Sequence, residues 1–351
     1  MANKHMPYDL AQMQSLPLEA KIIMTQQRIR QWYEHWEGQV YVSFSGGKDS
    51  TVLKHIVDGM YDDVPALFVN TGLEYPEIQK FAMSQKNVVT VRPEMRFDEV
   101  LKEYGYPVVG KKQARFIRDL QNANENNKAT VNLRLTGMNR EGKYLPTMKL
   151  ADKWVYLKDA PFNVSEQCCD VMKKAPMKAY QKQTGRVPII GTMANESERR
   201  RMSWLKNGCN AFETKSPTSQ PISFWTEQDI LHYIKKYNVP YASVYGDIVI
   251  DEKVDGENII EGQMNIIDYL ECHTQEDKLK TTGCSRTGCV FCMFGCHLEK
   301  GKNRFQKLKE THPRQYEYCI GGGEMVDGKW QPSKEGLGLG KVLDYIGVKY
   351  E

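Results

Sequence analysis

The fold is decided by one stretch of sequence, Val40-Tyr41-Val42-Ser43-Phe44-Ser45-Gly46-Gly47-Lys48-Asp49-Ser50. An alternating β-rich run ends at Phe44, the segment Ser45-Gly46-Gly47 follows, and a helix-compatible run continues from Ser50 to Met60. This order of strand, glycine loop and helix creates an anion site, because the free N–H groups at a helix N-terminus point outward and the helix dipole favours negative charge. The stretch therefore predicts a phosphate-binding loop.

Each residue of this loop has a chemical role in such a site. Gly46 and Gly47 let the backbone approach a phosphate without a Cβ in the way. Lys48 adds a point charge, and Asp49 can hold Mg²⁺ on a pyrophosphate group. Ser50 is placed to cap the helix or to donate a hydrogen bond to phosphate. The alternative is an ordinary Ser/Gly turn between a strand and a helix.

The composition is that of an ordinary soluble globular chain, with 351 residues, 40% hydrophobic and 26% charged. No run has the apolar length of a membrane span, and residues 1–18 lack the apolar core of a signal peptide, so we expect a cytoplasmic protein without a membrane partner. The net charge of +4 is too small to argue nucleic-acid binding by itself. Nine cysteines in such a chain indicate metal binding or catalysis rather than disulfides.

Strands and helices alternate along most of the chain. Apolar runs predict strands at residues 40–44, 65–70, 88–91 and 187–191. Helical patterns cover residues 18–36, 50–60, 97–104, 111–122, 170–184, 196–206 and 227–237, and Pro76 is suited to opening a further helix. Such alternation predicts a parallel sheet covered by helices, in which ligands bind at the carboxyl ends of strands. We expect a mobile loop at residues 122–144 and an insertion at residues 246–262.

The loop and four later segments resemble one protein family. Residues 45–50, SGGKDS, resemble the pyrophosphate loop of the adenine-nucleotide α-hydrolase superfamily, which includes the N-type ATP pyrophosphatases and the phosphoadenosine phosphosulfate (PAPS) reductase family. Residues 68–77 are similar to that family's DTGxxxPET turn, with Asn70 in place of the usual aspartate. Residues 191–200 resemble its GxRxxES segment, with Met193 in place of an arginine. Residues 221–230 resemble its P…WTxxDI segment, and the pairs 240–241 and 244–245 echo its PY…LY pattern.

The resemblance implies a fold, a division of the chain and an activity. The fold would be α/β, a Rossmann-like parallel sheet of the PP-loop (HUP) type flanked by helices. Residues 1–245 would form the nucleotide-binding domain, and residues 246–351 a Cys-rich metal or iron–sulfur extension. An intact loop suits an enzyme that splits ATP between its α- and β-phosphates, with Lys48 and Asp49 as catalytic residues and Mg²⁺ stabilising the departing pyrophosphate.

The resemblance also implies a set of nucleotide-binding residues: Ser45, Gly46, Gly47, Lys48, Asp49, Ser50, Asn70, Thr71, Gly72, Glu74, Gly191, Glu196 and Arg199. The bound nucleotide would be ATP or an adenylyl sulfonucleotide. For Glu74 and Glu196 the alternative is a solvated helix start, and for residues 199–201 it is a solvated helix face.

The cysteines form two groups. Residues 283–297 contain four, with a C-x₂-C spacing that lets two thiolates meet one metal across a tight turn. Residues 168–176 contain the pattern CC-x₃-K-x₂-P, and this pair followed by a later C-x₂-C resembles the iron–sulfur sulfonucleotide reductases. That resemblance implies Cys168, Cys169, Cys289 and Cys292 as ligands of one [4Fe–4S] cluster. The alternatives are a local zinc or cluster site of Cys284, Cys289, Cys292 and Cys296, or buried thiols that only pack.

Three functions follow. The first is an ATP pyrophosphatase or PAPS reductase-like enzyme that acts in sulfur transfer or adenylation, with a nucleic acid as acceptor and a sulfur-donor or partner protein. Residues 286–292 support this acceptor, since they resemble the RxGCxxC stretch of the family's DNA phosphorothioation enzyme. The second is a phosphoadenylyl- or adenylyl-sulfate reductase that releases sulfite, although no cysteine follows Cys319 as in the reductases' C-terminal Glu-Cys-Gly-Leu-His tail. The third is a non-catalytic nucleotide-sensing subunit.

Two basic runs bear on the acceptor. They comprise Lys111, Arg115 and Arg118, and Lys300, Lys302, Arg304, Lys307 and Lys309. If both runs face the entrance of the proposed site, they would attract the phosphate backbone of a nucleic acid. The alternative is that each run is a solvated helix face.

Overall fold

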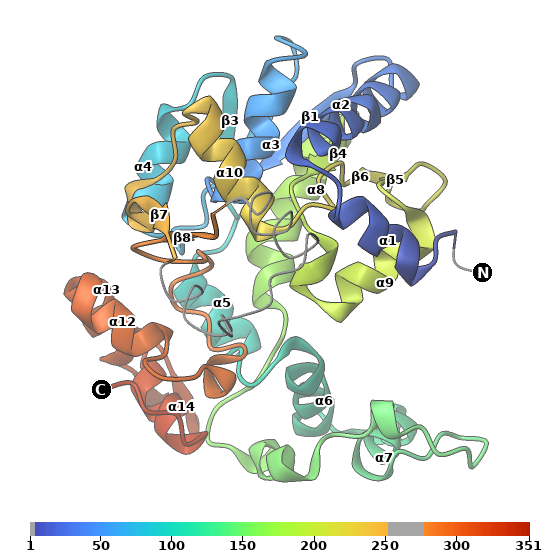
Figure 1. Ribbon diagram of the computed structural model, residues 1–351. Coiled ribbons are helices and arrows are strands. Elements are labelled where there is room, and N and C mark those ends of the chain that lie inside the picture. The colour runs from blue at the N-terminus through green and yellow to red at the C-terminus, as the bar shows by residue number, and fades with distance from the viewer. Residues whose placement is uncertain (1–3, 252–276) are drawn as a thin grey trace, which may run out of the picture. The chain divides into compact units, whose positions relative to one another are not determined.

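The structure is a computed structural model that describes residues 4–251 and 277–351. Contacts divide the chain into two compact units that alternate along the sequence (Figure 1). The first unit comprises Met1–Val69, Tyr75–Val91 and Tyr180–Thr287, and the second comprises Asn70–Glu74, Arg92–Ala179 and Gly288–Glu351. The two units are therefore interleaved in sequence, whereas the prediction placed one domain boundary after residue 245.

A six-stranded sheet forms the centre of the first unit (Figure 1). Its order is β3-β2-β1-β4-β6-β5, all neighbours being parallel except β5 and β6. The strands are β1 Val40–Phe44, β2 Ala66–Val69, β3 Val88–Val91, β4 Val187–Ile190, β5 Asn210–Ala211 and β6 Thr218–Ser219. The predicted α/β fold and the four predicted strands are confirmed.

The sequence of β1 explains its central position. Val42 pairs with Ala66 of β2 on one side and with Ile189 of β4 on the other. Four of its five side chains are buried, because helices cover the sheet and an interior parallel strand must be apolar on both faces. Phe44 ends the strand, so the glycine loop begins at the carboxyl edge of the sheet.

Except for α1, which was not predicted, the helices of the first unit follow the predicted ranges closely. They are α1 Pro7–Gln14, α2 Leu18–His35, α3 Lys48–Asp58, α4 Pro76–Ser84, α9 Glu198–Asn207 and α10 Glu227–Tyr237, while α8 Ala175–Thr184 continues into this unit from the second. Helix α3 packs against β1, and α4 begins at Pro76 as predicted. Beside them, β7 Ile248–Ile250 pairs antiparallel with β8 Leu279–Thr281. Of the insertion predicted at residues 246–262, the structure describes only residues 246–251, and the rest lies outside the described residues.

A buried ion pair joins α2 to α10. Lys21 Nζ lies 2.8 Å from Asp229 Oδ2, and Lys21 is only 3% exposed. Asp229 also accepts the backbone N–H of Thr226, which caps α10. The carboxylate therefore fixes the start of one helix and neutralises a cation from another.

We expect Asp229→Asn to lower the free energy of unfolding by about 3–5 kcal/mol, because it leaves the Lys21 charge buried and uncompensated. The control is Lys236→Gln, which removes an exposed ion pair with Glu19 between the same two helices and should cost about 0–1 kcal/mol. Urea unfolding of both variants measures the difference. Equal losses would show that the buried pair has no special role.

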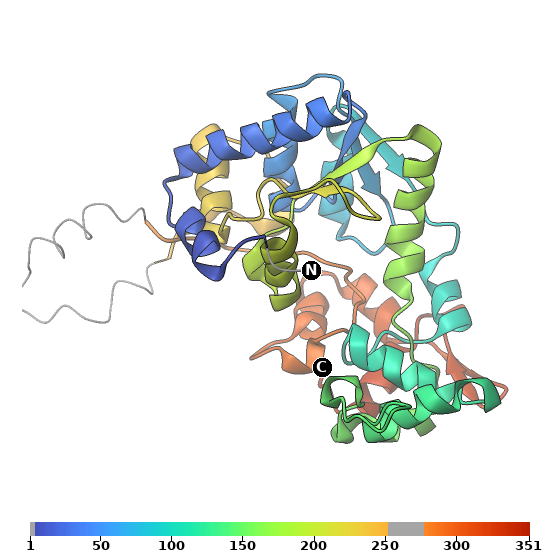
Figure 2. The same ribbon diagram turned by 90° about the vertical axis from the view of Figure 1, so that its right-hand side faces the viewer.

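The second unit is mainly helical. Its helices are α5 Phe97–Tyr104, α6 Lys111–Gln121, α7 Lys128–Thr136, α12 Arg304–Thr311, α13 Pro313–Ile320 and α14 Leu339–Tyr345, and β9 Glu324–Val326 pairs with β10 Lys329–Gln331. Its middle and C-terminal segments pack together, since the rings of Phe162 and Tyr345 lie 5.3 Å apart and the Tyr106 hydroxyl donates to the Leu337 carbonyl. Figure 2 shows the helices of this unit from a second side. None of the described helices in either unit combines the length and apolar character of a membrane span.

The prediction of a mobile loop at residues 122–144 is wrong. Helix α7 occupies the middle of this range, and it is held by a polar residue rather than by an apolar stripe. Arg134 is 5% exposed, donates to Asp119 at 2.9 Å and stacks over the ring of Phe116 at 4.0 Å. A buried arginine is invisible to hydrophobic periodicity, which is why the polar composition misled the prediction.

Candidate nucleotide and metal sites

The loop after β1 has the conformation that its glycines permit. Gly46 has φ +72°, and a Cβ there would lie 2.9 Å from the Ile78 side chain, so only glycine fits without a shift. Gly47 occupies the N-cap of α3, which begins at Lys48 rather than at Ser50. The loop therefore delivers Lys48 and Asp49 at the first turn of the helix, where its dipole favours anions.

The two serines hold the loop together. The Ser45 N–H donates to Ser50 Oγ at 3.1 Å, and Ser50 Oγ donates to the Gly47 carbonyl at 2.9 Å. The hydroxyl oxygens of Ser45 and Ser50 are 3.0 Å apart. Ser50 thus shapes the loop from inside the helix, and the predicted N-cap role belongs to Gly47.

Four segments of the first unit that are distant in sequence meet in a pocket of about 540 Å³. Its lining residues are Ser45, Gly47, Lys48, Asp49, Ser50, Gly191, Glu196, Tyr245, Arg286 and Thr287. Gly191 packs closely against α3, since a Cβ there would lie 3.1 Å from Ser50 Cα. The structure therefore brings the loop together with the predicted residues Gly191 and Glu196, and adds residues that the sequence had not assigned to a nucleotide.

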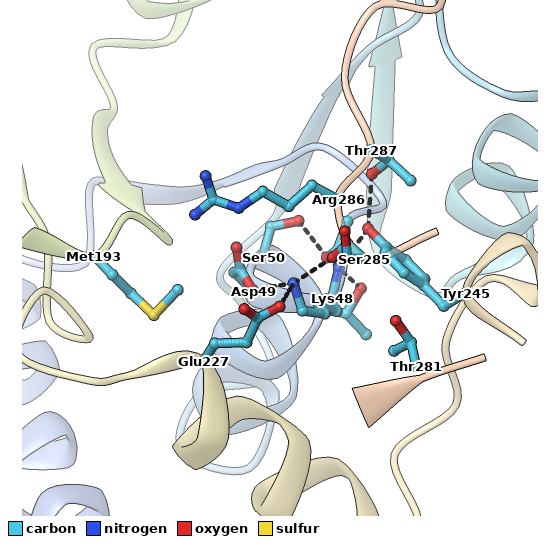
Figure 3. Close-up of polar contacts among 12 residues, drawn as sticks. Lys48, Asp49, Ser50, Met193, Glu227, Tyr245, Thr281, Ser285, Arg286 and Thr287 are labelled. Carbon is cyan, nitrogen blue, oxygen red and sulfur yellow. Dashed lines mark hydrogen bonds and ion pairs between the residues drawn. The ribbon is translucent and has the colours of Figure 1, made fainter. Parts of the chain in front are cut away.

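Lys48 lines this pocket, and Figure 3 shows the polar contacts of its side chain. The residue is 4% exposed, and its Nζ contacts Glu227 Oε1 at 3.1 Å and donates to the Ser285 carbonyl at 3.0 Å. Its backbone N–H donates to the Tyr245 hydroxyl at 3.2 Å. Both polar groups of Lys48 that a phosphate would use are thus bonded to protein oxygens.

Asp49 is a poorly satisfied carboxylate. Its Oδ1 is buried and accepts no hydrogen bond from the described residues, since Lys48 Nζ lies 3.6 Å away. Burial raises the pKa of Asp49, against the opposing charges of Lys48 and Arg286. A buried carboxylate oxygen without a donor fits a hard divalent cation such as Mg²⁺, which binds oxygen ligands.

Glu196 joins two arginines at the edge of the pocket. Its Oε2 contacts Arg200 and accepts the Met193 N–H at 2.9 Å, while its Oε1 lies 3.3 Å from Arg286 Nη2. Arg199, the predicted arginine, is exposed and is not among the residues that line the pocket. Its neighbour Arg200 makes the ion pair instead.

The predicted turn at residues 70–74 belongs to the second unit. Glu74 accepts hydrogen bonds from the Thr71 N–H at 3.1 Å and hydroxyl at 2.7 Å, and the Gly72 N–H donates to Asn70 Oδ1 at 3.2 Å. Asn70 and Thr71 are buried. Glu74 therefore closes a compact polar turn rather than serving as a solvated helix start.

A second pocket, of about 310 Å³, lies within the second unit. Its lining residues are Leu73, Phe97, Pro107, Cys168, Cys169, Met172, Lys173, Cys289 and Cys292. All four cysteines of the first predicted ligand set face this pocket. Of the alternative set, Cys284 belongs to the first unit, and Cys296 is buried outside the lining.

The tandem cysteines sit at an unusual helix start. A π-helical turn, Asp170–Lys174, directly follows Cys168 and Cys169 and leads into α8. Such turns occur often at functional sites. The Sγ atoms of Cys168 and Cys169 are 4.0 Å apart, and the hydrogen bond between them lowers the pKa of the Cys169 thiol. Burial raises the pKa of Cys289 to about 11.

The donor set of this pocket fits a thiolate-ligated centre. Four thiols, an otherwise apolar wall and the ammonium of Lys173 match the needs of an anionic iron–sulfur cluster or of zinc. Across residues 4–251 and 277–351, no three Cys, His, Asp or Glu side chains stand in a preformed metal-binding arrangement. Ligation would therefore draw the thiolates together from their present positions.

The domain match identifies the family. The sequence pattern of the phosphoadenosine phosphosulfate reductase domain matches residues 39–141 and 143–293, which is more than half of the chain. The chain belongs to the phosphoadenosine phosphosulfate reductase family. The six-stranded sheet and the loop at its carboxyl edge are consistent with this assignment.

Individual relatives are more distant. An uncharacterised protein of Methanocaldococcus jannaschii is 34% identical over 86 residues, which cover 22% of this chain and 21% of that protein. The chain thus matches about a fifth of the length of this curated relative. The PAPS reductase of Candida auris in a phosphate complex shares 13% identity over 62% of this chain and 82% of its own, with a TM-score of 0.36. The U34-tRNA thiolase NcsA of Methanococcus maripaludis, with its [4Fe–4S] cluster, shares 16% sequence identity over 64% of this chain and 66% of its own, with a TM-score of 0.33.

Proposed function

We propose that this chain binds ATP at the loop of residues 45–50 and cleaves it between the α- and β-phosphates. One observation carries the proposal: the pocket at the N-terminus of α3 joins a glycine-shaped loop, a buried lysine and the carboxylate of Asp49, whose buried Oδ1 accepts no hydrogen bond from the described residues. Such groups suit phosphate chemistry better than core packing. The reaction would adenylate an acceptor in a sulfur-transfer process.

The chemical step balances without a redox partner. An oxygen of the acceptor forms a bond to the α-phosphorus while the bond from that phosphorus to the bridging oxygen breaks. Pyrophosphate leaves with the electron pair, and the acceptor becomes an adenylate. Lys48 would stabilise the charge that develops on the leaving group, because a fixed cation in a water-poor site acts strongly there. Asp49 would hold the Mg²⁺ ion, which supplies further charge neutralisation to the same phosphates.

The cysteine pocket supports a second part of the proposal. Cys168, Cys169, Cys289 and Cys292 would hold a [4Fe–4S] cluster, which supplies electron-transfer or sulfur-handling chemistry when bound. Zinc is the alternative occupant. Cluster-ligating thiolates persist in a reducing compartment, so a cytoplasmic location is part of this proposal.

A sulfonucleotide reductase that releases sulfite is the second candidate, and it needs an accessible attacking thiolate. Cys319 cannot supply one as it stands, because it is fully buried and burial raises its pKa well above the ordinary value. The third candidate binds nucleotide without turnover. Incubation of anaerobically purified protein with ATP, and separately with PAPS, distinguishes all three: we expect pyrophosphate from ATP. Release of sulfite from PAPS would support the sulfonucleotide reductase. Nucleotide binding without any product would support the sensing subunit.

We further propose a nucleic acid as the acceptor. The second unit contains 27 lysines and arginines against 20 aspartates and glutamates, so it is more basic than the whole chain. Several residues of the two basic runs are exposed on its helices, including Arg115 on α6 and Lys307 and Lys309 on α12. Arg118 and Arg304 are instead paired with Glu166 and Glu299. A charged surface of this kind favours a phosphate backbone.

We expect this surface to give salt-dependent DNA or RNA binding. Each of Arg115→Gln, Lys307→Gln and Lys309→Gln should weaken binding and lower the slope of log K against log salt by about 0.7–0.9, because fewer counterions are released. Arg118→Gln is the matched control, since its charge is already used by Glu166. A low-salt titration with no binding to either nucleic acid would exclude this acceptor.

A further inference from the structure

The lysine of the phosphate loop is covered by a short segment of the same unit, residues 283–287, which we call the strap. Its first residues are fixed: the Gly283 N–H donates to the Tyr245 carbonyl and the Cys284 N–H to the Val244 carbonyl, both at 2.9 Å. A Cβ on Gly283 would lie 2.4 Å from the Val244 carbonyl oxygen, so only glycine permits this approach. The next residue of the strap, Ser285, accepts a hydrogen bond from Lys48 Nζ at 3.0 Å through its carbonyl oxygen.

Three protein groups occupy the positions where phosphate oxygens would bind Lys48 (Figure 3). Ser285 of the strap accepts from Nζ, and Glu227 at the start of α10 forms the ion pair at 3.1 Å. Tyr245 accepts the backbone N–H of Lys48, and its hydroxyl lies 2.7 Å from Thr287 Oγ1. A phosphate group can reach Lys48 only by replacing some of these oxygens.

The charges of the pocket are already balanced. Lys48, Arg200 and Arg286 are matched by Asp49, Glu196 and Glu227. Arg286 is held weakly, because its side chain is 59% exposed and its contact with Glu196 is 3.3 Å long. Glu227 is 46% exposed and can leave Lys48 for water at little cost. Lys48 itself is buried and cannot lose its anionic partner without a replacement.

We propose that Glu227 and Glu196 act as internal substitutes for phosphate, and that a polyphosphate exchanges with them. The incoming phosphates replace Glu227 as the partner of Lys48, and they replace Glu196 as the partner of Arg286. Arg286 is then a phosphate-binding residue, and Glu227 is a competitor that sets the affinity for the polyphosphate. The inference rests on the proposed nucleotide function and identifies the β- and γ-phosphates, rather than adenosine, as the part of the ligand that the strap recognises.

The proposal makes a prediction of opposite sign for two charged residues. Glu227→Gln should tighten the binding of inorganic pyrophosphate about tenfold, because the competing carboxylate is removed. Arg286→Gln should weaken pyrophosphate and ATP binding about tenfold or more, while adenosine binding changes less than twofold. Arg201→Gln is the matched control, since Arg201 forms a comparable exposed pair with Glu198 on α9 and should change nothing. Isothermal titration with pyrophosphate, ATP and adenosine measures all of these.

The titrations are carried out with EDTA and again with Mg²⁺. If Glu227 instead holds the metal ion, Glu227→Gln should bind pyrophosphate more weakly with Mg²⁺ and equally well with EDTA. This result would overturn the exchange proposal. Unchanged binding in both variants would overturn it as well, and would leave the nucleotide function standing. A parent protein that binds neither ATP nor pyrophosphate would overturn both.

Discussion

Replacement of Asp49 by alanine is expected to reduce pyrophosphate release from ATP by about 100-fold or more while the fold stays intact. The reason is that a single preorganised electrostatic group at a phosphate site contributes about that much to the rate. Asp49 lies at the carboxyl edge of the sheet, on the first turn of α3, and not in the hydrophobic core. A coupled pyrophosphate assay together with thermal unfolding checks both halves of the prediction.

Asp58→Ala is the control for this variant. Asp58 is the last residue of the same helix and pairs only with Lys54 in the described structure, so its loss should leave turnover unchanged. If Asp49→Ala turned over ATP at the parental rate, the assignment of the loop to ATP cleavage would be wrong.

The protonation of Asp49 adds a pH dependence with a definite sign. Burial raises its folded pKa above the ordinary value of 3.8, so the fold favours the protonated form. Its contribution to stability is therefore present below the ordinary pKa and lost as the pH rises through the raised pKa. Metal binding needs the ionised form, so pyrophosphate release should rise with pH over that same range. Asp49→Asn should thus be inactive and, at neutral pH, more stable than the parent.

The second large effect concerns iron. Cys168→Ser or Cys169→Ser should lose the visible absorbance and most of the iron after anaerobic reconstitution, because the loss of one of four ligands exposes a cluster to solvent and oxygen. Both residues line the pocket that Cys289 and Cys292 share. Iron and sulfide analysis per chain gives the measurement.

Cys284→Ser and Cys296→Ser are the controls for the cluster. Neither residue lines that pocket, so both variants should keep their iron. Full iron retention in both tandem-pair variants would instead support the local set of Cys284, Cys289, Cys292 and Cys296. Zinc in place of iron in the parent protein would assign the pocket to a structural site.

The sheet could be predicted from sequence because its strands are buried on both faces. Runs such as residues 65–70 have no polar residue before the strand ends, and the helices between them show a regular apolar spacing. Helix α7 escaped prediction since Arg134, a charged residue, anchors it. Periodicity reports apolar burial and cannot report a buried guanidinium with a carboxylate and a ring around it.

The strand, glycine loop and helix at residues 40–58 were also predictable, but the groups around Lys48 were not. Glu227, Tyr245 and Ser285 follow it by about 180 to 240 residues in sequence, and only the fold brings their oxygens within hydrogen-bond distance. Arg200 was missed for a local reason: the backbone is extended at Ser197, between Glu196 and the start of α9, so the geometry of this turn could not be deduced from residue spacing.

The choice between the cysteine sets needed the structure for a similar reason. A C-x₂-C pair serves either set equally well, so its spacing does not discriminate between them. The fold adds one observation that spacing lacks: Cys168, Cys169, Cys289 and Cys292 line the same pocket, which is why our prediction uses this set.

The products formed from ATP test the central claim most directly. Anaerobically purified protein is incubated with Mg²⁺ and ATP labelled separately at the α- and γ-phosphates, with a nucleic acid present and absent, and the products are resolved by chromatography. We predict that the γ-label appears in pyrophosphate and the α-label in AMP or an adenylated acceptor, with both products reduced by about 100-fold or more in Asp49→Ala. Formation of ADP and inorganic phosphate, or no cleavage under any of these conditions, would contradict the account.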